Sequence, residues 1–336
     1  MSDSQKIKLQ HSSGIFYAYK MACINQFSFD ALGYRHFNEN IDKFSGLPRP
    51  AKWLGNKKFK TFAEKFSKIL NFAWRFFFAY VYFSIIALRY IFALKEGRGH
   101  GFNKKYVDHL LLGAAPRSVF VFSSALDDGE NKYCLSLPWV NIYKDLENSK
   151  FIEIKLLDVV GRRDIFKAFC RACKAHAITS SDRNISFQTY IGINWFLVYS
   201  AIRKLNPKKI FTAEHHDRWA ILLDFMAENK NADDGFLFTI VQHGLEHEST
   251  YSEMQKTNYG AGVGLPYKIK NVDAIYVYNE AQLKIIRDNI INSNKELSVN
   301  YFKVRLLLHD IGAPQKKKIM FIGHPFCYEL QLFIYL

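Results

Sequence analysis

The stretch that decides the fold runs from Lys208 to Glu248 and reads KKIFTAEHHDRWAILLDFMAENKNADDGFLFTIVQHGLEHE. Two short apolar runs, at 208–213 and 236–241, flank a helical pattern over about 217–227. A strand, a helix and a strand within about 35 residues predict a βαβ unit with a right-handed crossover. Both strands are continuously apolar rather than alternating, which is typical of a parallel sheet covered on both faces.

Both predicted strands end in dense clusters of titratable residues. The first is followed by Glu214, His215, His216 and Asp217, and the second by the segment 242–248, which reads QHGLEHE. In open α/β sheets, ligands bind outside the carboxyl ends of the strands. We therefore expect the first cluster to line a site, although Asp217 also fits a purely structural role as the N-cap of the next helix.

Gln242, His243 and Gly244 place an imidazole directly at a strand end. A histidine there could take a proton from a hydroxyl group near neutral pH, and the glycine would let the backbone turn sharply or approach a ligand. The alternative is a turn histidine that bonds only to neighbouring backbone. Both interpretations stay open at this point.

The same rhythm of strands and helices extends on both sides of the central unit and predicts a doubly wound, Rossmann-like α/β domain over roughly 116–310. Further strands are expected at 118–123, 151–157, 272–278 and 301–308, and further helices at 138–147, 163–177, 185–205 and 281–291. A new strand at 319–323 would open a second domain, of which only a stub, 311–336, is present.

Composition sets the class of protein. The 336 residues are 49% hydrophobic and 23% charged, which is typical of a folded chain with a substantial core. Five scattered cysteines predict no disulfide framework, and the chain has no recognisable leader, so we expect a cytoplasmic location. The net charge of +15 suggests nucleic acid as a partner, but no recognition motif supports this, and we expect none.

Much of the positive charge lies in the N-terminal region, 1–115, where 41–110 holds fourteen Lys and Arg against four Asp and Glu. Within it, 52–96 is basic and then strongly apolar. Its uninterrupted core, Phe76 to Leu88, is 13 residues long, whereas a bilayer span takes about 20. For the first 50 residues the only element suggested is a strand at 15–19.

The polar residues of this apolar segment recur every seven positions. Such spacing predicts a slowly drifting stripe on one face of a helix, formed by Lys68, Arg75, Tyr82, Arg89 and Glu96. An apolar helix with basic flanks suits the membrane interface, where cations meet anionic headgroups, so Lys68, Arg75 and Arg89 are the candidate membrane-contacting residues. Two alternatives are a buried core helix whose arginines reach the surface and a tilted transmembrane span.

Taken together, the strand 239–241 and the motif Gln242-His243-Gly244 that ends it resemble the acceptor-side domain of bacterial GT-B glycosyltransferases of capsule and lipopolysaccharide biosynthesis. The segment 317–326 is similar to the opening strand of the donor half in that family, with a proline-containing turn after it. The resemblance covers roughly 118–326. It implies a truncated member of the family that lacks most of the donor domain.

What the resemblance implies is sugar transfer from a nucleotide-sugar donor to a saccharide on a polyprenyl diphosphate, at the cytoplasmic face of the inner membrane. His243 would be the catalytic base and Glu214 would orient it or stabilise its charged form. The acceptor would bind at His215, His216, Gln242, Gly244 and His247, and the remnant of the donor site would be His324 and Pro325. We expect no cofactor and no metal. The activity of the truncated form stays open at this point, and the alternative function is a non-catalytic, membrane-associated subunit or scaffold of the polysaccharide assembly machinery.

Overall fold

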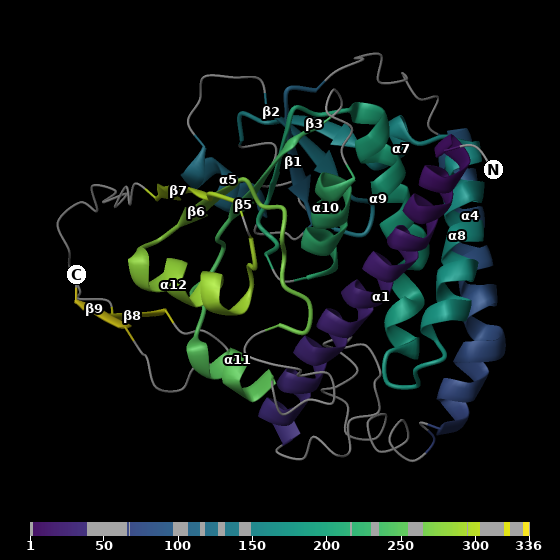
Figure 1. Ribbon diagram of the computed structural model, residues 1–336, viewed down its shortest axis with the longest axis horizontal. Helices are drawn as coiled ribbons and strands as arrows, with labels where there is room; N and C mark the ends of the chain where they lie inside the picture. The colour runs from purple at the N-terminus through teal and green to yellow at the C-terminus, as the bar shows by residue number, and fades with distance from the viewer. Residues whose placement is uncertain are drawn as a thin grey trace.

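The fold is built on one seven-stranded sheet in which every neighbouring pair of strands is parallel (Figure 1). The computed structural model describes residues 3–38, 66, 68–96, 107–114, 118–126, 132–140, 149–215, 217–229, 235–254, 265–293, 295–302, 319–322 and 332–335. The strands are β1 (His109–Gly113), β2 (Lys132–Ser136), β3 (Ile152–Lys155), β4 (Lys209–Thr212), β5 (Leu237–Val241), β6 (Ala274–Val277) and β7 (Ser298–Tyr301).

The strand order is β3-β2-β1-β4-β5-β6-β7. This is the order of a Rossmann-like doubly wound sheet with a seventh strand added at one edge. The chain runs outward from β1 to β3, then returns to the middle of the sheet and runs outward the other way from β4. The topological switch point therefore lies between β1 and β4, and in such sheets ligands bind at the carboxyl ends of those strands.

Helices cover the two faces of the sheet unequally. On one face α5 (Ser118–Ala125) packs on side chains such as Leu111 and Phe211. The larger core lies on the opposite face, where the sheet packs against α9 (Gly192–Leu205), α10 (Arg218–Glu228) and α12 (Glu280–Asn289).

A second layer of helices lies outside α9 and α10, at the right of Figure 1. There α1 (Asp3–Asn38) packs on α10, α8 (Arg162–Thr179) packs on α9, and α4 (Ala79–Glu96) packs on α8. One π-helical turn, η2 (Trp74–Phe78), precedes α4 within the continuous helix 68–96. Within the first 115 residues, α1, the helix 68–96 and β1 therefore all pack in the same body as the rest of the sheet.

The structure confirms the central βαβ unit as β4, α10 and β5. It also confirms a strand at β3, a helix at α8, a strand at β6 and a helix at α12, with small shifts of their ends. The apolar segment 185–205 begins as the 3-10 helix η3 (Ser186–Ile191) and continues as α9. Its helix ends at Asn206 in the left-handed conformation. Two short helices, α7 (Leu156–Val159) and α11 (Glu248–Met254), complete this part.

Two of the sequence predictions are wrong in kind. The segments 15–19 and 118–123, expected as strands, are helical, in α1 and α5. In α5, Val119, Phe122 and Leu126 recur at helical spacing and are buried, whereas Phe120 is exposed. Two adjacent parallel strands need a crossover, and α5 supplies part of the one between β1 and β2, so tertiary packing overrides the β propensity of valine and phenylalanine.

The sequence analysis missed β1 and β2. The helix expected at 138–147 and the strand expected at 301–308 both lie mostly outside the described residues. Strand β7, at Ser298–Tyr301, ends where the expected strand begins. A strand does occur at β8 (Ile319–Ile322), where it pairs antiparallel with β9 (Leu332–Tyr335) in a two-stranded sheet of its own.

Candidate functional site

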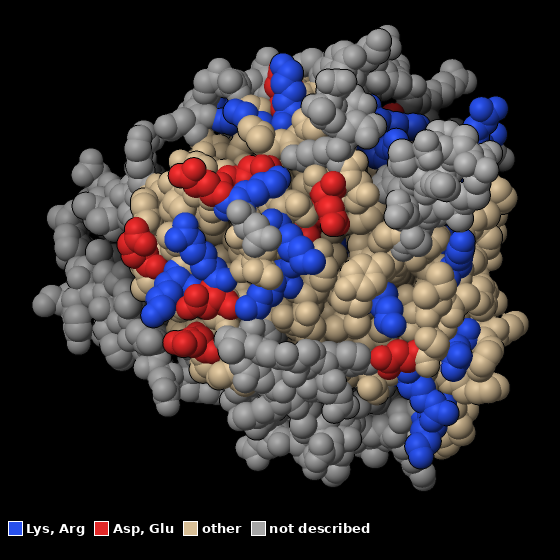
Figure 2. All heavy atoms as spheres, viewed as in Figure 1, with Lys and Arg blue, Asp and Glu red and all other residues tan. Residues whose placement is uncertain are grey.

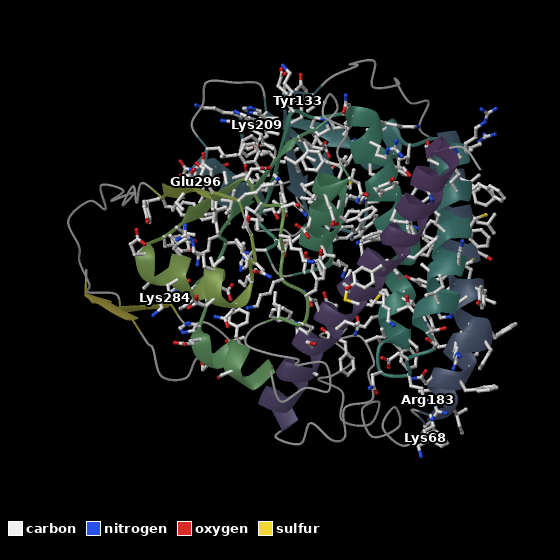
Figure 3. All side chains as sticks on the ribbon, in the orientation of Figure 1. Lys68, Tyr133, Arg183, Lys209, Lys284 and Glu296 are labelled. Carbon is white, nitrogen blue, oxygen red and sulfur yellow. The ribbon has the colours of Figure 1, made fainter. Side chains whose placement is uncertain are left out.

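Two loops at the carboxyl edge of the sheet bring most of the described candidate residues together. One follows β4 and covers 213–217, and the other follows β5 and covers 242–248. The two strands are parallel neighbours, with Thr212 paired to Ile240, so both loops leave the sheet side by side, and the first of them lies at the switch point. Figure 3 labels Tyr133 and Lys209 near the amino ends of β2 and β4, and the candidate site is at the opposite edge, the one nearer α11.

The geometry of His243 suits a base. Its Nδ1 lies 2.6 Å from the carbonyl oxygen of Ala213, across the gap between the two loops. A carbonyl can only accept a hydrogen bond, so Nδ1 carries the proton in the neutral ring. The lone pair of that neutral ring is then on Nε2, which is the nitrogen able to take up a proton. His243 is half-buried.

His215 is completely buried beside His243, with 4.8 Å between the ring centroids. Its Nδ1 lies 3.3 Å from the same carbonyl of Ala213, and its Nε2 contacts the Glu246 carboxylate. Burial alone would lower the pKa of His215, but the carboxylate of Glu246 outweighs it and the pKa is raised. The other carboxylate oxygen of Glu246 accepts the hydroxyl of Tyr251, a buried residue of α11.

Glu214 is a carboxyl group held mainly in its neutral form. Burial raises its pKa to about 8, and the negative charge of Asp217 adds to this, whereas His215 and Arg218 act in the opposite direction. Near neutral pH the group is therefore a proton donor at the switch point. Asp217 is the N-cap of α10, as predicted, because its Oδ1 accepts the backbone N–H groups of Trp219 (2.7 Å) and Ala220 (3.3 Å).

Gln242 holds the second loop in place from inside. Its side chain is fully buried, and its Nε2 donates to the carbonyl of Gly244 (2.7 Å) and to Oε1 of Gln282 (2.5 Å). Gln282, on α12, also accepts the N–H of Glu246 (2.7 Å) and donates to its carbonyl (3.0 Å). The hydrogen bonds of these two glutamine side chains fix the loop that carries both His243 and Glu246.

The remaining predicted site residues divide between this loop and the parts that are not described. Gly244 and His247 lie on the loop, both half-buried. A Cβ added at Gly244 would meet no atom within 4 Å, so the space beside it is open. His216 and the two predicted donor residues, His324 and Pro325, lie outside the described residues.

Sequence reasoning missed Glu246, Tyr251 and Gln282. Glu246 sits three residues after His243, where an acidic residue is easily taken for an exposed loop position. Its burial depends on Gln282, 36 residues further along the chain, and no local pattern announces that contact. The available signal was weaker: four titratable residues, at 243, 246, 247 and 248, crowded after a strand end.

Within the described part of the chain, no group of three or more His, Cys, Asp or Glu residues is placed to hold a metal ion. The described side chains of the site are an imidazole with a basic Nε2, a buried imidazole–carboxylate pair and a mainly neutral carboxyl group. Comparisons with family models, with curated proteins and with solved structures gave no match to this chain. Its function has to be inferred from this geometry and from the sequence.

Proposed function

We propose that the carboxyl edge of this sheet is the acceptor side of a GT-B-type glycosyltransferase of surface-polysaccharide biosynthesis. The observation that carries the proposal is the position and tautomer of His243: its basic Nε2 belongs to a half-buried ring in a loop beside the switch point. In the proposed step Nε2 removes the proton of an acceptor hydroxyl. The hydroxyl oxygen then attacks the anomeric carbon of the donor sugar, and the nucleoside diphosphate departs.

The surroundings of His243 fit an acceptor that approaches from solvent. The open space at Gly244 lets a ligand come close to the loop backbone, because no side chain fills it. In this proposal Glu214, whose raised pKa keeps its carboxyl group mainly neutral, donates a hydrogen bond to a sugar oxygen. His215 and Gln242 are buried and hydrogen-bonded within the protein, so in this proposal they support the site and do not contact the acceptor.

The helix 68–96 supports a membrane location. Its exposed face is apolar, and six of the residues on it are Phe72, Phe76, Val81, Ile85, Leu88 and Phe92. The step from 76 to 81 is one residue longer than an α-helical step, and the π-helical turn η2 absorbs that residue, so the apolar face continues along the helix. This turn also shifts Tyr82 and Arg89 around the helix relative to Lys68 and Arg75, so the seven-residue polar stripe is broken.

The protein anchors the opposite face of this helix. Phe83 is fully buried, and the Trp74 indole donates to the carbonyl of Ser186 at 2.9 Å. The buried His176 of α8 bonds to the carbonyl of Arg75 at 3.0 Å and to the hydroxyl of Thr189 at 2.7 Å. Only 22% of the most apolar window of 68–94 is buried, so the described residues do not enclose the helix as they would a core helix.

By length and composition this helix could also cross a membrane, with a mean hydropathy of 1.8 over its most apolar window. Its neighbour argues for a position at the surface instead. Helix α8 packs along it and exposes Arg163, Lys167 and Lys174, and each of these at the centre of a bilayer would cost about 2.5–3.5 kcal/mol. Among the charged side chains drawn over this side of the molecule in Figure 2, most are blue, and they are set in a largely tan surface.

We therefore propose that the protein lies on the cytoplasmic face of the inner membrane, with its apolar stripe in the interface and its cations against anionic headgroups. Lys68 and Arg183, labelled at the lower end of the helical layer in Figure 3, are both exposed and would add to that contact. The acceptor would then be a saccharide on a polyprenyl diphosphate, which is confined to the same surface.

The test is a transfer assay on membranes from cells that produce the chain. Labelled UDP-, GDP-, CDP- and dTDP-sugars are supplied one at a time, and the label that moves into solvent-extractable lipid is measured. Transfer from one donor class, absent in membranes without the protein, is the expected result. If the protein binds the membrane but neither transfers sugar nor retains lipid-linked saccharide, the result would instead favour the non-catalytic scaffold.

A further inference from the structure

Both ring nitrogens of His215 face oxygen atoms that can only accept. Nε2 contacts the Glu246 carboxylate, and Nδ1 lies 3.3 Å from the carbonyl of Ala213. A carbonyl has no proton to give, and neither has Glu246 in its ionised form, so with Glu246 ionised each nitrogen must carry its own. A neutral imidazole has one N–H, and therefore the arrangement requires the imidazolium form, a positive charge inside the protein.

The surroundings of Glu246 keep its carboxylate charged. Tyr251 donates its hydroxyl to one oxygen, and burial together with the Glu246 charge raises the pKa of that hydroxyl well above its usual value, so it stays a donor. The Gln282 carboxamide binds both backbone polar groups of Glu246. Gln282 thus fixes the backbone of Glu246, Tyr251 fixes one carboxylate oxygen, and the other oxygen contacts His215.

We propose that Glu246 is a positioning residue of the site: it holds His215 as a buried imidazolium, whose charge keeps the neighbouring His243 ring neutral and ready to accept a proton. The two rings are 4.8 Å apart and share one carbonyl, Ala213, as acceptor. A second proton on His243 would place two cations side by side. This inference rests on the proposed role of His243 as a base.

Other charges near the two histidines modify this effect without reversing it. Glu214, on the β4 loop, is mostly neutral below about pH 8 and therefore adds little negative charge near neutral pH. Asp217 and Arg218, at the start of α10, have opposite charges and are adjacent in the chain, so their fields partly cancel. Glu246 itself contacts His215 at Nε2, and its other oxygen accepts a hydrogen bond from the Tyr251 hydroxyl.

The experiment is a titration of the histidine side chains by nitrogen-15 NMR on the full chain, with His243→Asn used for assignment. At pH 7 the wild-type protein should show both nitrogens of His215 protonated and His243 neutral with its proton on Nδ1. A neutral His215 at pH 7 would overturn the proposal from the wild-type spectrum alone, so the result does not depend on how stable any variant is.

Glu246→Gln keeps the shape of the side chain and removes its charge. In this variant His215 should lose its second proton, and the titration midpoint of His243 should rise by about one unit. The matched control is Glu248→Gln, which removes an exposed carboxylate two residues away and should leave the midpoint almost unchanged. A His243 midpoint that stays constant while His215 is deprotonated would also refute the proposal.

These measurements need neither sugar nor membrane, so they can fail while the transfer assay succeeds, and the reverse. Where transfer is observed, Glu246→Gln should move the acid limb of the rate–pH profile upward by the same unit. A role in folding alone would lower the rate at every pH without moving that limb.

Discussion

The candidate site and the helix 68–96 break the usual rule of burial in opposite directions. At the carboxyl edge, an imidazole, a glutamine and a tyrosine hydroxyl are buried, together with most of a carboxylate. On the helix, phenylalanines face outward, with Phe72 67% exposed. Burying charge and exposing large apolar surface both oppose folding, so neither is expected from packing alone. Each departure is therefore the place to look for a ligand: a polar one at the site and a lipid at the helix.

The largest effect that we expect is the loss of sugar transfer when His243 at the candidate site is replaced. His243→Asn keeps a donor that can reach the carbonyl of Ala213 but removes the basic nitrogen. Transfer should fall by about 10²–10⁴-fold, the usual contribution of a general base. The melting temperature should change little, because the ring is half-buried and its internal contact is preserved. Transfer at the wild-type rate would return His243 to the role of a turn residue, and a large loss of melting temperature would make it a packing residue.

The helix offers a matched pair that separates lipid contact from folding. Phe83 is 0% exposed and Phe72 is 67% exposed, on one continuous helix. Phe83→Ala should lower the free energy of unfolding by about 3–5 kcal/mol. Phe72→Ala should leave it nearly unchanged and weaken binding to vesicles with anionic lipid by about tenfold, measured by flotation.

The opposite pattern would contradict the membrane proposal. If Phe72→Ala destabilises the fold and leaves flotation unchanged, the exposed stripe contacts protein rather than lipid. Flotation in high salt, which screens the basic residues but not the apolar contact, separates the two parts of the attraction.

Two glycines differ in the space around them, Gly192 being tightly packed and Gly244 open. A Cβ at Gly192 would come within 3.0 Å of the Ala172 Cβ and 3.2 Å of the Tyr19 hydroxyl, where α9 meets α8 and α1. Gly192→Ala should therefore destabilise the protein by about 1–3 kcal/mol in chemical denaturation. Gly244→Ala meets no atom within 4 Å and should leave stability unchanged, while raising the KM for the acceptor if a ligand occupies that space. An unchanged KM would show that the acceptor does not approach there.

The sequence was informative where a local pattern and the tertiary structure agree. Continuous apolar runs predicted β4 and β5, and Asp217 predicted the start of α10, because strand burial and helix capping are local effects. The predictions failed where distant contacts decide. The helix α5 forms in a β-prone segment because of the sheet beneath it, and the π-helical turn breaks a seven-residue stripe that the sequence shows intact. The loop position of Glu246 depends on a hydrogen bond to Gln282, which lies on α12 and is distant in the sequence.

The last prediction concerns Glu214 and the pH dependence of the free energy of unfolding, whose sign follows from the direction of the pKa shift. The carboxyl group has a folded pKa of about 8 against an ordinary value of 4.5. Between these two pH values the folded protein binds a proton that the unfolded chain releases, so stability falls as the pH rises from about 4.5 to 8.

Glu214→Gln cannot ionise and should lack this loss. The difference in unfolding free energy between variant and wild type should be near zero at pH 4.5, grow as the pH rises to about 8, and stay constant above that pH. His215 is also titratable but is present in both proteins, so its contribution largely cancels. Glu228→Gln, at the exposed far end of α10, is the control and should show no such pH dependence. Denaturation curves at five pH values measure it, and a difference that is flat with pH would mean that Glu214 is ionised in the folded site and cannot donate a hydrogen bond to the acceptor.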